Sequence, residues 1–334
     1  MAGKPPVAPT ASLIQHLYSV PDFLPPSAVL LTAMVFEWLL RSWLQNAARE
    51  KLREKVVEAA HEHMAGPDAE NDVTQRPCDV GVVFALGIES AGLEDVMEGL
   101  ITVRGNQFLV RHGGLKGRHV VLAISGIGAA AAQRATEAVW NGHHPRWILS
   151  AGFSGALEPG LDRNHIVVAQ SVGDTAGHRI DVDLQSGPIA WKETPSVRIG
   201  RLLTVDHILR QPKEKRSLGQ QHQALAVDME SYAVAEVCRQ SAAHFLAVRV
   251  VSDTVDEVLP PDIERLARQK STAGRFGAAL AAALDRPGAL KEMLKLKENA
   301  LVASDRLARF LTSVVVKLVP LEKAEGEKAS GREG

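Results

Sequence analysis

Short apolar runs alternate with helical patterns through the middle of the chain, over residues 78–285. The runs are rich in Val, Leu and Ala, and most of them stop at a glycine or a carboxylate. Residues 129–140 and 260–284 have helical spacing instead. Strands that alternate with helices are typical of α/β domains. We therefore predict a three-layer α/β/α domain around a twisted, mostly parallel sheet, with strands at 80–86, 108–111, 119–125, 147–151, 165–169, 201–205, 224–227 and 245–251.

The N-terminal flank, residues 1–77, is predicted to be a helical extension followed by a linker. Its apolar stretch runs from Ala28 to Leu44 and is interrupted by Glu37 and Arg41. The uninterrupted part is too short for a membrane span, which needs roughly 20 residues. Two interpretations stay open: the stretch packs on the main domain or on a partner, or it makes a peripheral contact with a membrane surface.

The C-terminal flank, residues 286–334, is predicted to form a helix and a disordered tail. Leu301 and Leu307 recur at helical spacing, and residues 310–318 form a second amphipathic element. Residues 322–334 are charged and contain glycine and serine, which is typical of a disordered segment.

Composition narrows the classes of partner. The chain has 334 residues, a formal net charge of −1 and 4% aromatic residues. A near-neutral charge and few aromatic side chains argue against nucleic acid as a partner. Cys78 and Cys238 lack metal-ligand spacing, so we expect buried thiols in a reducing, cytoplasmic compartment and no metal site.

Residues 224–256 contain a strand, a helix and a second strand, and each strand ends in carboxylates. The first run stops at Asp228 and Glu230, and the second stops at Asp253. Ligands of open α/β sheets bind beyond the carboxyl ends of parallel strands, so we expect these acids to project into one crevice. A second interpretation stays open, because Asp228 or Glu230 also stands where an acidic residue caps the following helix.

Glycine-rich turns follow three other predicted strands, at residues 87–89, 125–128 and 152–157. Glycines let the backbone approach a ligand closely and donate its N–H groups. The sequence lacks the GxGxxG and GxxxxGK[ST] patterns, so it does not support dinucleotide or triphosphate binding. Glu89 adds a third carboxylate, and such groups bind sugar hydroxyls, exchange protons and activate water.

Five motifs of the chain stand out: ALGIE (85–89), SGIG (125–128), SAGFSGAL (150–157), VDME (227–230) and VVSDTVD (250–256). Together these motifs resemble the nucleoside phosphorylase/nucleosidase superfamily, and most closely its hydrolytic branch, the methylthioadenosine/S-adenosylhomocysteine nucleosidases. The resemblance covers residues 78–285. It implies an N-ribosyl hydrolase that cleaves the glycosidic bond of a purine nucleoside, which we expect to be a 5′-modified adenosine, without metal or organic cofactor. We also expect a homodimer.

The resemblance also implies roles for individual residues. Asp253 would protonate N7 of the purine as the glycosidic bond breaks, and Glu89 would activate the attacking water. Glu230 would hold the ribose hydroxyls, with Met229 packed beneath the sugar. The other members of the implied substrate-binding set are Asp228, Ser252, Phe153, Ser154, Gly126 and Ile208.

The first glycine turn separates hydrolysis from phosphorolysis. Phosphorylases of this superfamily bind phosphate with an arginine there, whereas this turn reads GIESAGLED and contains Glu89, which would repel phosphate. Water is therefore the expected nucleophile.

The base pocket departs from the family pattern. Phe153 and Ser154 replace a common Ser-Ala pair, and His207-Ile208 stands where an aromatic residue usually stacks on adenine. These departures leave a non-catalytic nucleoside-binding protein open as an alternative. Two enzymes of the same fold also stay open: a purine nucleoside phosphorylase, and an enzyme acting on adenosylated hopanoid lipids, whose membrane-proximal substrate would suit the apolar stretch at 28–44 and the amphipathic element at 310–318.

Overall fold

The computed structural model describes residues 77–104, 108–185, 187–260, 263 and 289–321. The apolar stretch at 28–44, most of the helix predicted at 260–284 and the tail at 322–334 lie outside these ranges.

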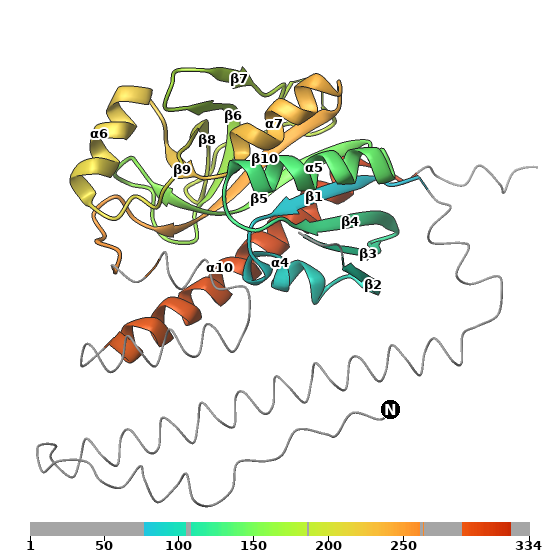
Figure 1. The fold of residues 1–334 in the computed structure, drawn as a ribbon, viewed down its shortest axis with the longest axis horizontal. Helices are drawn as coiled ribbons and strands as arrows, with labels where there is room; N and C mark the ends of the chain where they lie inside the picture. Colours follow the sequence, from blue (N-terminus) through green and yellow to red (C-terminus); the bar gives the residue numbers. More distant parts are fainter. Residues whose placement is uncertain (1–76, 105–107, 186, 261–262, 264–288, 322–334) are drawn as a thin grey trace, which may run out of the picture. The chain divides into compact units, whose positions relative to one another are not determined.

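The centre of the fold is a ten-stranded sheet in the order β10-β6-β8-β9-β5-β1-β4-β3-β2, with β7 paired to β6 off this path (Figure 1). A further pairing of β10 with β5 closes β5, β9, β8, β6 and β10 into a ring. The strands are β1 (Val80–Phe84), β2 (Glu98–Arg104), β3 (Leu109–Leu115), β4 (Arg118–Ile124), β5 (Trp147–Ala156), β6 (Ile166–Asp174), β7 (Arg179–Asp181), β8 (Val197–Thr204), β9 (Ala226–Asp228) and β10 (His244–Asp253).

The predicted α/β fold with a central sheet is confirmed, but the sheet is mixed. The pairs β1–β4, β1–β5, β5–β10, β6–β8 and β8–β9 are parallel. The pairs β2–β3, β3–β4, β5–β9, β6–β7 and β6–β10 are antiparallel. Apolar runs reveal buried strands, but they do not reveal strand direction, which depends on how the connections cross the sheet.

Helices cover both faces of the sheet (Figure 1). Helices α5 (Ala129–His143) and α7 (Ser231–Gln240) pack on one face, in a core that contains Val83 and Ile148. Helices α4 (Gly87–Glu94) and α10 (Ala289–Leu318) pack on the other, in a core that contains Val82 and Phe84. Neighbouring residues Val82 and Val83 thus face opposite layers, as the alternation along a strand requires.

Helix α10 is one continuous helix, although the sequence suggests a second, separate element at 310–318. Its buried face shares the core of the sheet and includes Leu307, Leu311 and Val315. The Ser304 hydroxyl accepts a hydrogen bond of 3.0 Å from the Gly92 backbone N–H, and this bond ties α10 to α4. A Cβ at residue 92 would lie 3.0 Å from the Ser304 carbonyl oxygen, so glycine permits this close packing.

Four further elements differ from the prediction. Strand β5 continues through the glycine-rich stretch to Ala156, where a turn was expected from residue 152. The charged segment after Pro212 forms helix α6 (Pro212–His222). Strands β2 and β7 were not predicted, and both have exposed positions that break the apolar pattern.

The extension of β5 brings the carboxylate-bearing strands together. Gly155 pairs with Val227 of β9 on one side and with Asp253 of β10 on the other. Strand β9 runs antiparallel to β5, so the expectation that β9 and β10 are parallel is wrong. The acids still meet, because both strands flank the same residue of β5. A Cβ on Gly155 would lie 3.0 Å from Asp253 Oδ2, so only glycine leaves room for that carboxylate.

The described residues also bear on the expected state of the cysteines and on the expected absence of a membrane span. Cys78 and Cys238 are free and buried, as predicted. Among the helices that the structure describes, none combines the length and apolar character that a bilayer crossing requires.

Candidate functional site

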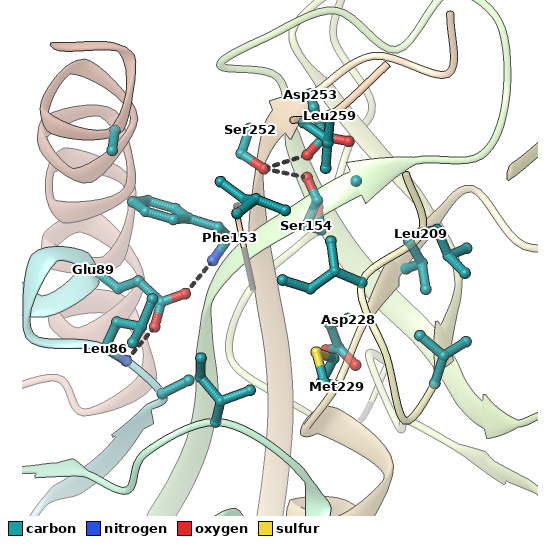
Figure 2. Close-up of a pocket in the computed structure, with 18 of the residues that line it drawn as sticks. Leu86, Glu89, Phe153, Ser154, Leu209, Asp228, Met229, Ser252, Asp253 and Leu259 are labelled. Atoms are coloured by element: carbon teal, nitrogen blue, oxygen red, sulfur yellow. Dashed lines mark hydrogen bonds between the residues drawn. The ribbon is translucent and has the colours of Figure 1, made fainter. Parts of the chain in front are cut away.

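A cavity of about 250 Å³ opens beside Gly155. Most of its walls are apolar, and four acidic side chains reach it from three parts of the chain. Nine of the ten predicted site residues line this cavity, whereas Gly126 does not. Figure 2 shows Glu89, Phe153, Ser154, Asp228, Met229, Ser252 and Asp253 around it. The nine are Glu89, Phe153, Ser154, Ile208, Asp228, Met229, Glu230, Ser252 and Asp253.

Gly126 has a turn role instead. Its φ of 86° lies in the left-handed region that glycine adopts readily, and its N–H bonds to the Ala85 carbonyl oxygen at 3.0 Å. The SGIG motif contributes to the site through its last glycine, because the Gly128 N–H donates a 2.8 Å hydrogen bond to Glu230 Oε1.

Glu89 is fixed by two backbone donors at the start of α4. Its Oε2 accepts the Leu86 N–H and its Oε1 accepts the Phe153 N–H, both at 2.8 Å (Figure 2). A Cβ on Gly152 would lie 2.7 Å from Oε1, so the glycine turn is shaped around this carboxylate. Burial raises the pKa of the Glu89 carboxyl above its ordinary value, against the opposing effect of the Phe153 N–H. A carboxylate with a raised pKa is a stronger base once it is ionised.

Asp228 is part of the scaffold beneath the cavity. Its Oδ2 pairs with Arg249 at 2.8 Å, and both side chains are buried. Its Oδ1 accepts the backbone N–H groups of Glu230 and Ser231 at 3.3 Å, at the start of α7. The N-cap position of α7 is Glu230, whose side chain makes no capping hydrogen bond, so Asp228 accepts these N–H groups from the residue that precedes Met229 and the cap. This pairing occupies both of its oxygens and orients the neighbouring Glu230.

Glu230 is a second buried carboxyl group whose charged form is disfavoured. Burial first, and then the negative charge of Asp228, raise the pKa of Glu230 to about 8, while Arg249 opposes the shift. Its Oε2 also accepts the Met229 N–H at 3.2 Å. A carboxyl group held in this way at a cavity wall is suited to binding hydroxyl groups of a ligand.

Asp253 ends strand β10 and is 6% exposed. Ser252 Oγ donates to its Oδ1 at 2.7 Å, and the same hydroxyl lies 3.1 Å from the Ser154 carbonyl oxygen (Figure 2). Lys215 Nζ of α6 donates to Oδ2 at 2.5 Å. Both carboxylate oxygens of Asp253 thus accept a hydrogen bond, and these bonds fix the orientation of the side chain.

Several site residues were missed by sequence reasoning. Lys215 lies in a charged segment whose pattern resembles a solvent-exposed face, so nothing in the sequence marks it as buried. Arg163 follows β5 and forms an ion pair with Glu257, which holds the loop after Asp253. Helix α10 supplies a wall of the cavity from outside the motif-bearing region, with Leu296, Asn299 and Ala300.

The chemistry of the cavity favours an uncharged, partly apolar ligand with hydroxyl groups. Its acidic side chains are buried and its hydrophobic walls include Phe153, Ile208 and Met229. Ser154 Oγ is buried without a hydrogen-bond partner among the described residues. Within the same ranges, no group of three or more His, Cys, Asp or Glu side chains is arranged to hold a metal ion.

Known relatives share this sequence region and fold. A 5′-methylthioadenosine/S-adenosylhomocysteine nucleosidase of Tolumonas auensis is 26% identical over 212 residues, which cover 55% of this chain and 90% of the relative. A protein of the same name from Staphylococcus haemolyticus is 24% identical over 198 residues, covering 52% of this chain and 86% of the relative.

A solved structure of such a nucleosidase from S. pneumoniae, with a transition-state inhibitor, has a TM-score of 0.55 to this chain. The two are 16% identical, and the likeness covers 72% of this chain and all of the other, which shows a common fold. The family model described as the phosphorylase superfamily matches residues 79–286. Since this match spans more than half of the sequence and contains the loops that build the cavity, the chain belongs to the phosphorylase superfamily.

Proposed function

We propose that this protein is an N-ribosyl hydrolase that cleaves the glycosidic bond of a purine nucleoside. The observation that carries the proposal is the convergence of Glu89, Glu230 and Asp253 on one largely apolar cavity. The names of the two relatives support the same chemistry and suggest a 5′-modified adenosine, such as methylthioadenosine or S-adenosylhomocysteine, as substrate.

Each of the three carboxyl groups has a separate role in the proposed reaction. Glu230 binds the ribose hydroxyls, and Met229 lies beneath the sugar. As the C1′–N9 bond breaks, its electron pair passes to the purine, and Asp253 delivers a proton to N7. A water molecule adds its oxygen to C1′, and Glu89 takes the proton of that water. Protonation of the leaving group and activation of the nucleophile both stabilise the oxocarbenium-like transition state.

Water is the proposed nucleophile because the basic side chains that line the described cavity are already paired with acids and are poorly placed to bind phosphate. Arg163 and His207 are the basic side chains among the lining residues, and Arg163 is paired with Glu257 while His207 contacts Asp206 and Glu214. Buried Glu89 would repel a phosphate anion at the position of the nucleophile. A purine nucleoside phosphorylase of the same fold is therefore the second candidate.

Adenine release from methylthioadenosine, S-adenosylhomocysteine and adenosine, measured with and without phosphate, tests the proposal. We expect release without phosphate, and we expect Asp253→Asn to abolish it in protein that circular dichroism shows to be folded, although loss of the charged partner of buried Lys215 should lower the melting temperature. Release that requires phosphate would establish the phosphorylase instead. If none of the three is cleaved but adenine binds, the protein is a non-catalytic nucleoside-binding protein or acts on a larger substrate such as an adenosylated hopanoid.

From the sequence alone, we also propose that the protein is a homodimer in the cytoplasm. We propose that it makes a peripheral membrane contact through the apolar stretch from Ala28 to Leu44. Sedimentation velocity of the full chain tests the dimer, and a monomer at micromolar concentration would contradict it.

A further inference from the structure

Strand β10 contains an extra residue where it reaches the cavity. Val251 pairs with Ser154 of β5. Asp253 pairs with the next residue of β5, Gly155. Two steps along β10 thus match one step along β5, which makes Ser252 a β-bulge. A bulge bends its strand and re-aims the side chains beside it, so the direction of the Asp253 side chain depends on how the bulge is held.

Two hydrogen bonds hold the bulged residue. Ser252 Oγ donates to the Ser154 carbonyl oxygen at 3.1 Å (Figure 2). Arg163, in the loop between β5 and β6, donates from Nη1 to the Ser252 carbonyl oxygen. The backbone groups of a bulged residue leave the regular ladder and need partners from elsewhere, and Arg163 supplies one.

The loop that carries Arg163 is itself bound to the end of β10. The Asn164 N–H donates to the Val251 carbonyl oxygen at 2.9 Å, and the Val251 N–H donates to the His165 carbonyl oxygen at 2.9 Å. These backbone bonds place the base of the Arg163 side chain directly beside the bulge.

The same guanidinium forms a bidentate ion pair with Glu257. Its Nε donates to Oε1 at 2.9 Å and its Nη2 donates to Oε2. The two side chains are 30% and 33% exposed, so solvent weakens the attraction of their charges, but the paired bonds still impose a fixed geometry. The Glu257 N–H donates to the Thr254 carbonyl oxygen at 3.2 Å and closes a turn directly after Asp253. Arg163 therefore joins the residues on either side of Asp253.

We propose that Arg163 is a positioning residue for the reaction: by binding Ser252 and Glu257 with one guanidinium, it fixes the direction in which the Asp253 carboxyl group faces the cavity. The inference rests on the proposed function, in which Asp253 delivers a proton to the departing base. Proton transfer requires donor and acceptor within hydrogen-bond reach, and a misplacement of about 1 Å lowers a rate by up to about 100-fold.

Loss of Arg163 should therefore affect turnover more than substrate binding. Glu230, which holds the ribose in the proposed reaction, is fixed by the N–H groups of Gly128 and Met229 and not by the loop of Arg163. The ribose should stay bound while the proton donor is misdirected. A fall in kcat at a nearly constant KM is the expected signature.

Steady-state kinetics of adenine release by the full chain tests the inference. The substrate is whichever of methylthioadenosine, S-adenosylhomocysteine and adenosine the wild type cleaves with the highest kcat/KM. We expect Arg163→Met to lower kcat about 10- to 100-fold with KM within about twofold of the wild type. Glu257→Gln, which weakens the ion pair from its other partner, should change kcat in the same direction.

Arg216→Met is the matched control. Arg216 pairs with Asp256 of the same segment, but its side chain is 44% exposed and its printed sequence neighbour in the pair lies away from the bulge. An exposed ion pair contributes little, so kcat should stay within about twofold of the wild type.

Three results would overturn the inference. One is an Arg163→Met variant with the kcat of the wild type. Another is a higher KM at unchanged kcat, which would make Arg163 a ligand-binding residue. The third is an equal loss of kcat in Arg163→Met and Arg216→Met, which would assign the effect to general loosening of the segment that follows Asp253.

Arg163→Lys carries the test if Arg163→Met does not fold. Lysine keeps the positive charge but lacks the planar fork that reaches Ser252 and both oxygens of Glu257. The kcat of folded Arg163→Lys should still fall, and an unchanged kcat there also overturns the inference.

Failure of the proposed function gives a different result. A wild type that cleaves none of the three nucleosides refutes the hydrolase and, with it, the role given to Arg163. An active wild type whose kcat does not depend on Arg163 overturns the inference alone.

Discussion

At the scale of single residues, the site depends on carboxyl groups whose charges are costly to bury. Glu89 and Glu230 both have raised pKa values, and burial is the largest cause in each case. Both carboxyl groups accept backbone N–H groups on both oxygens, but Glu230 also lies close to the negative charge of Asp228, which raises its pKa further. Sequence reasoning found both acids from the motifs around them but had no means of estimating their burial.

The raised pKa values predict a shifted pH dependence. Glu89 must be ionised to accept a proton from water, so a raised pKa moves the onset of activity to higher pH, and Glu230 adds a second group that loses its proton near pH 8. We expect the acidic limb of kcat/KM for adenine release to lie well above pH 4.5, the ordinary value for glutamate. Circular dichroism over the same range serves as a control for unfolding. Full activity retained at pH 5 in folded protein would contradict the assigned roles.

At the scale of elements, α10 is the clearest addition that the structure makes to the motif-bearing region. It packs on the sheet, contacts α4 through Ser304 and lines the cavity with Leu296, Asn299 and Ala300. Because α4 carries Glu89, packing of α10 also supports the position of that carboxylate. The helix begins beyond residue 286, where the family match ends.

Two substitutions in α10 compare the effect of removing a buried leucine with that of removing an exposed one. Leu307 is fully buried and Leu301 is 45% exposed. We expect Leu307→Ala to lower the free energy of unfolding by about 2–5 kcal/mol, from lost burial and the cavity left behind. Leu301→Ala should change it by less than about 0.5 kcal/mol. Urea denaturation measures both, and equal effects would show that α10 does not pack as described.

The predictable parts of the fold are those in which burial leaves a local pattern in the sequence. Continuous apolar runs identified β1, β4, β5, β6 and β10, because buried strands need apolar residues on both faces. Helix α6 was missed because its buried position is a lysine and its other residues lack an apolar stripe. The meeting of β9 and β10 at Gly155 depends on strand direction and closure of the ring, which no local pattern contains.

At the scale of the whole molecule, the chain divides into two compact units, residues 1–72 and 73–334. All residues found to line the cavity lie between Ala85 and Ala300, within the second unit. The proposed chemistry therefore has its acid, its base and its sugar-binding group in one unit. The apolar stretch from Ala28 to Leu44, which motivates the proposed membrane contact, belongs to the other.

This division predicts that catalysis and membrane contact are separable. A chain that begins at residue 73 should release adenine with the kcat/KM of the full chain, because it retains every residue that lines the described cavity. The full chain should float with liposomes in a sucrose gradient and the shortened chain should not, since hydrophobic burial in the interface requires the apolar stretch. A shortened chain that folds but loses activity would place an essential contact in residues 1–72. Equal flotation of the two chains would instead assign membrane contact to the second unit, and failure of both to float would leave the apolar stretch to pack against protein.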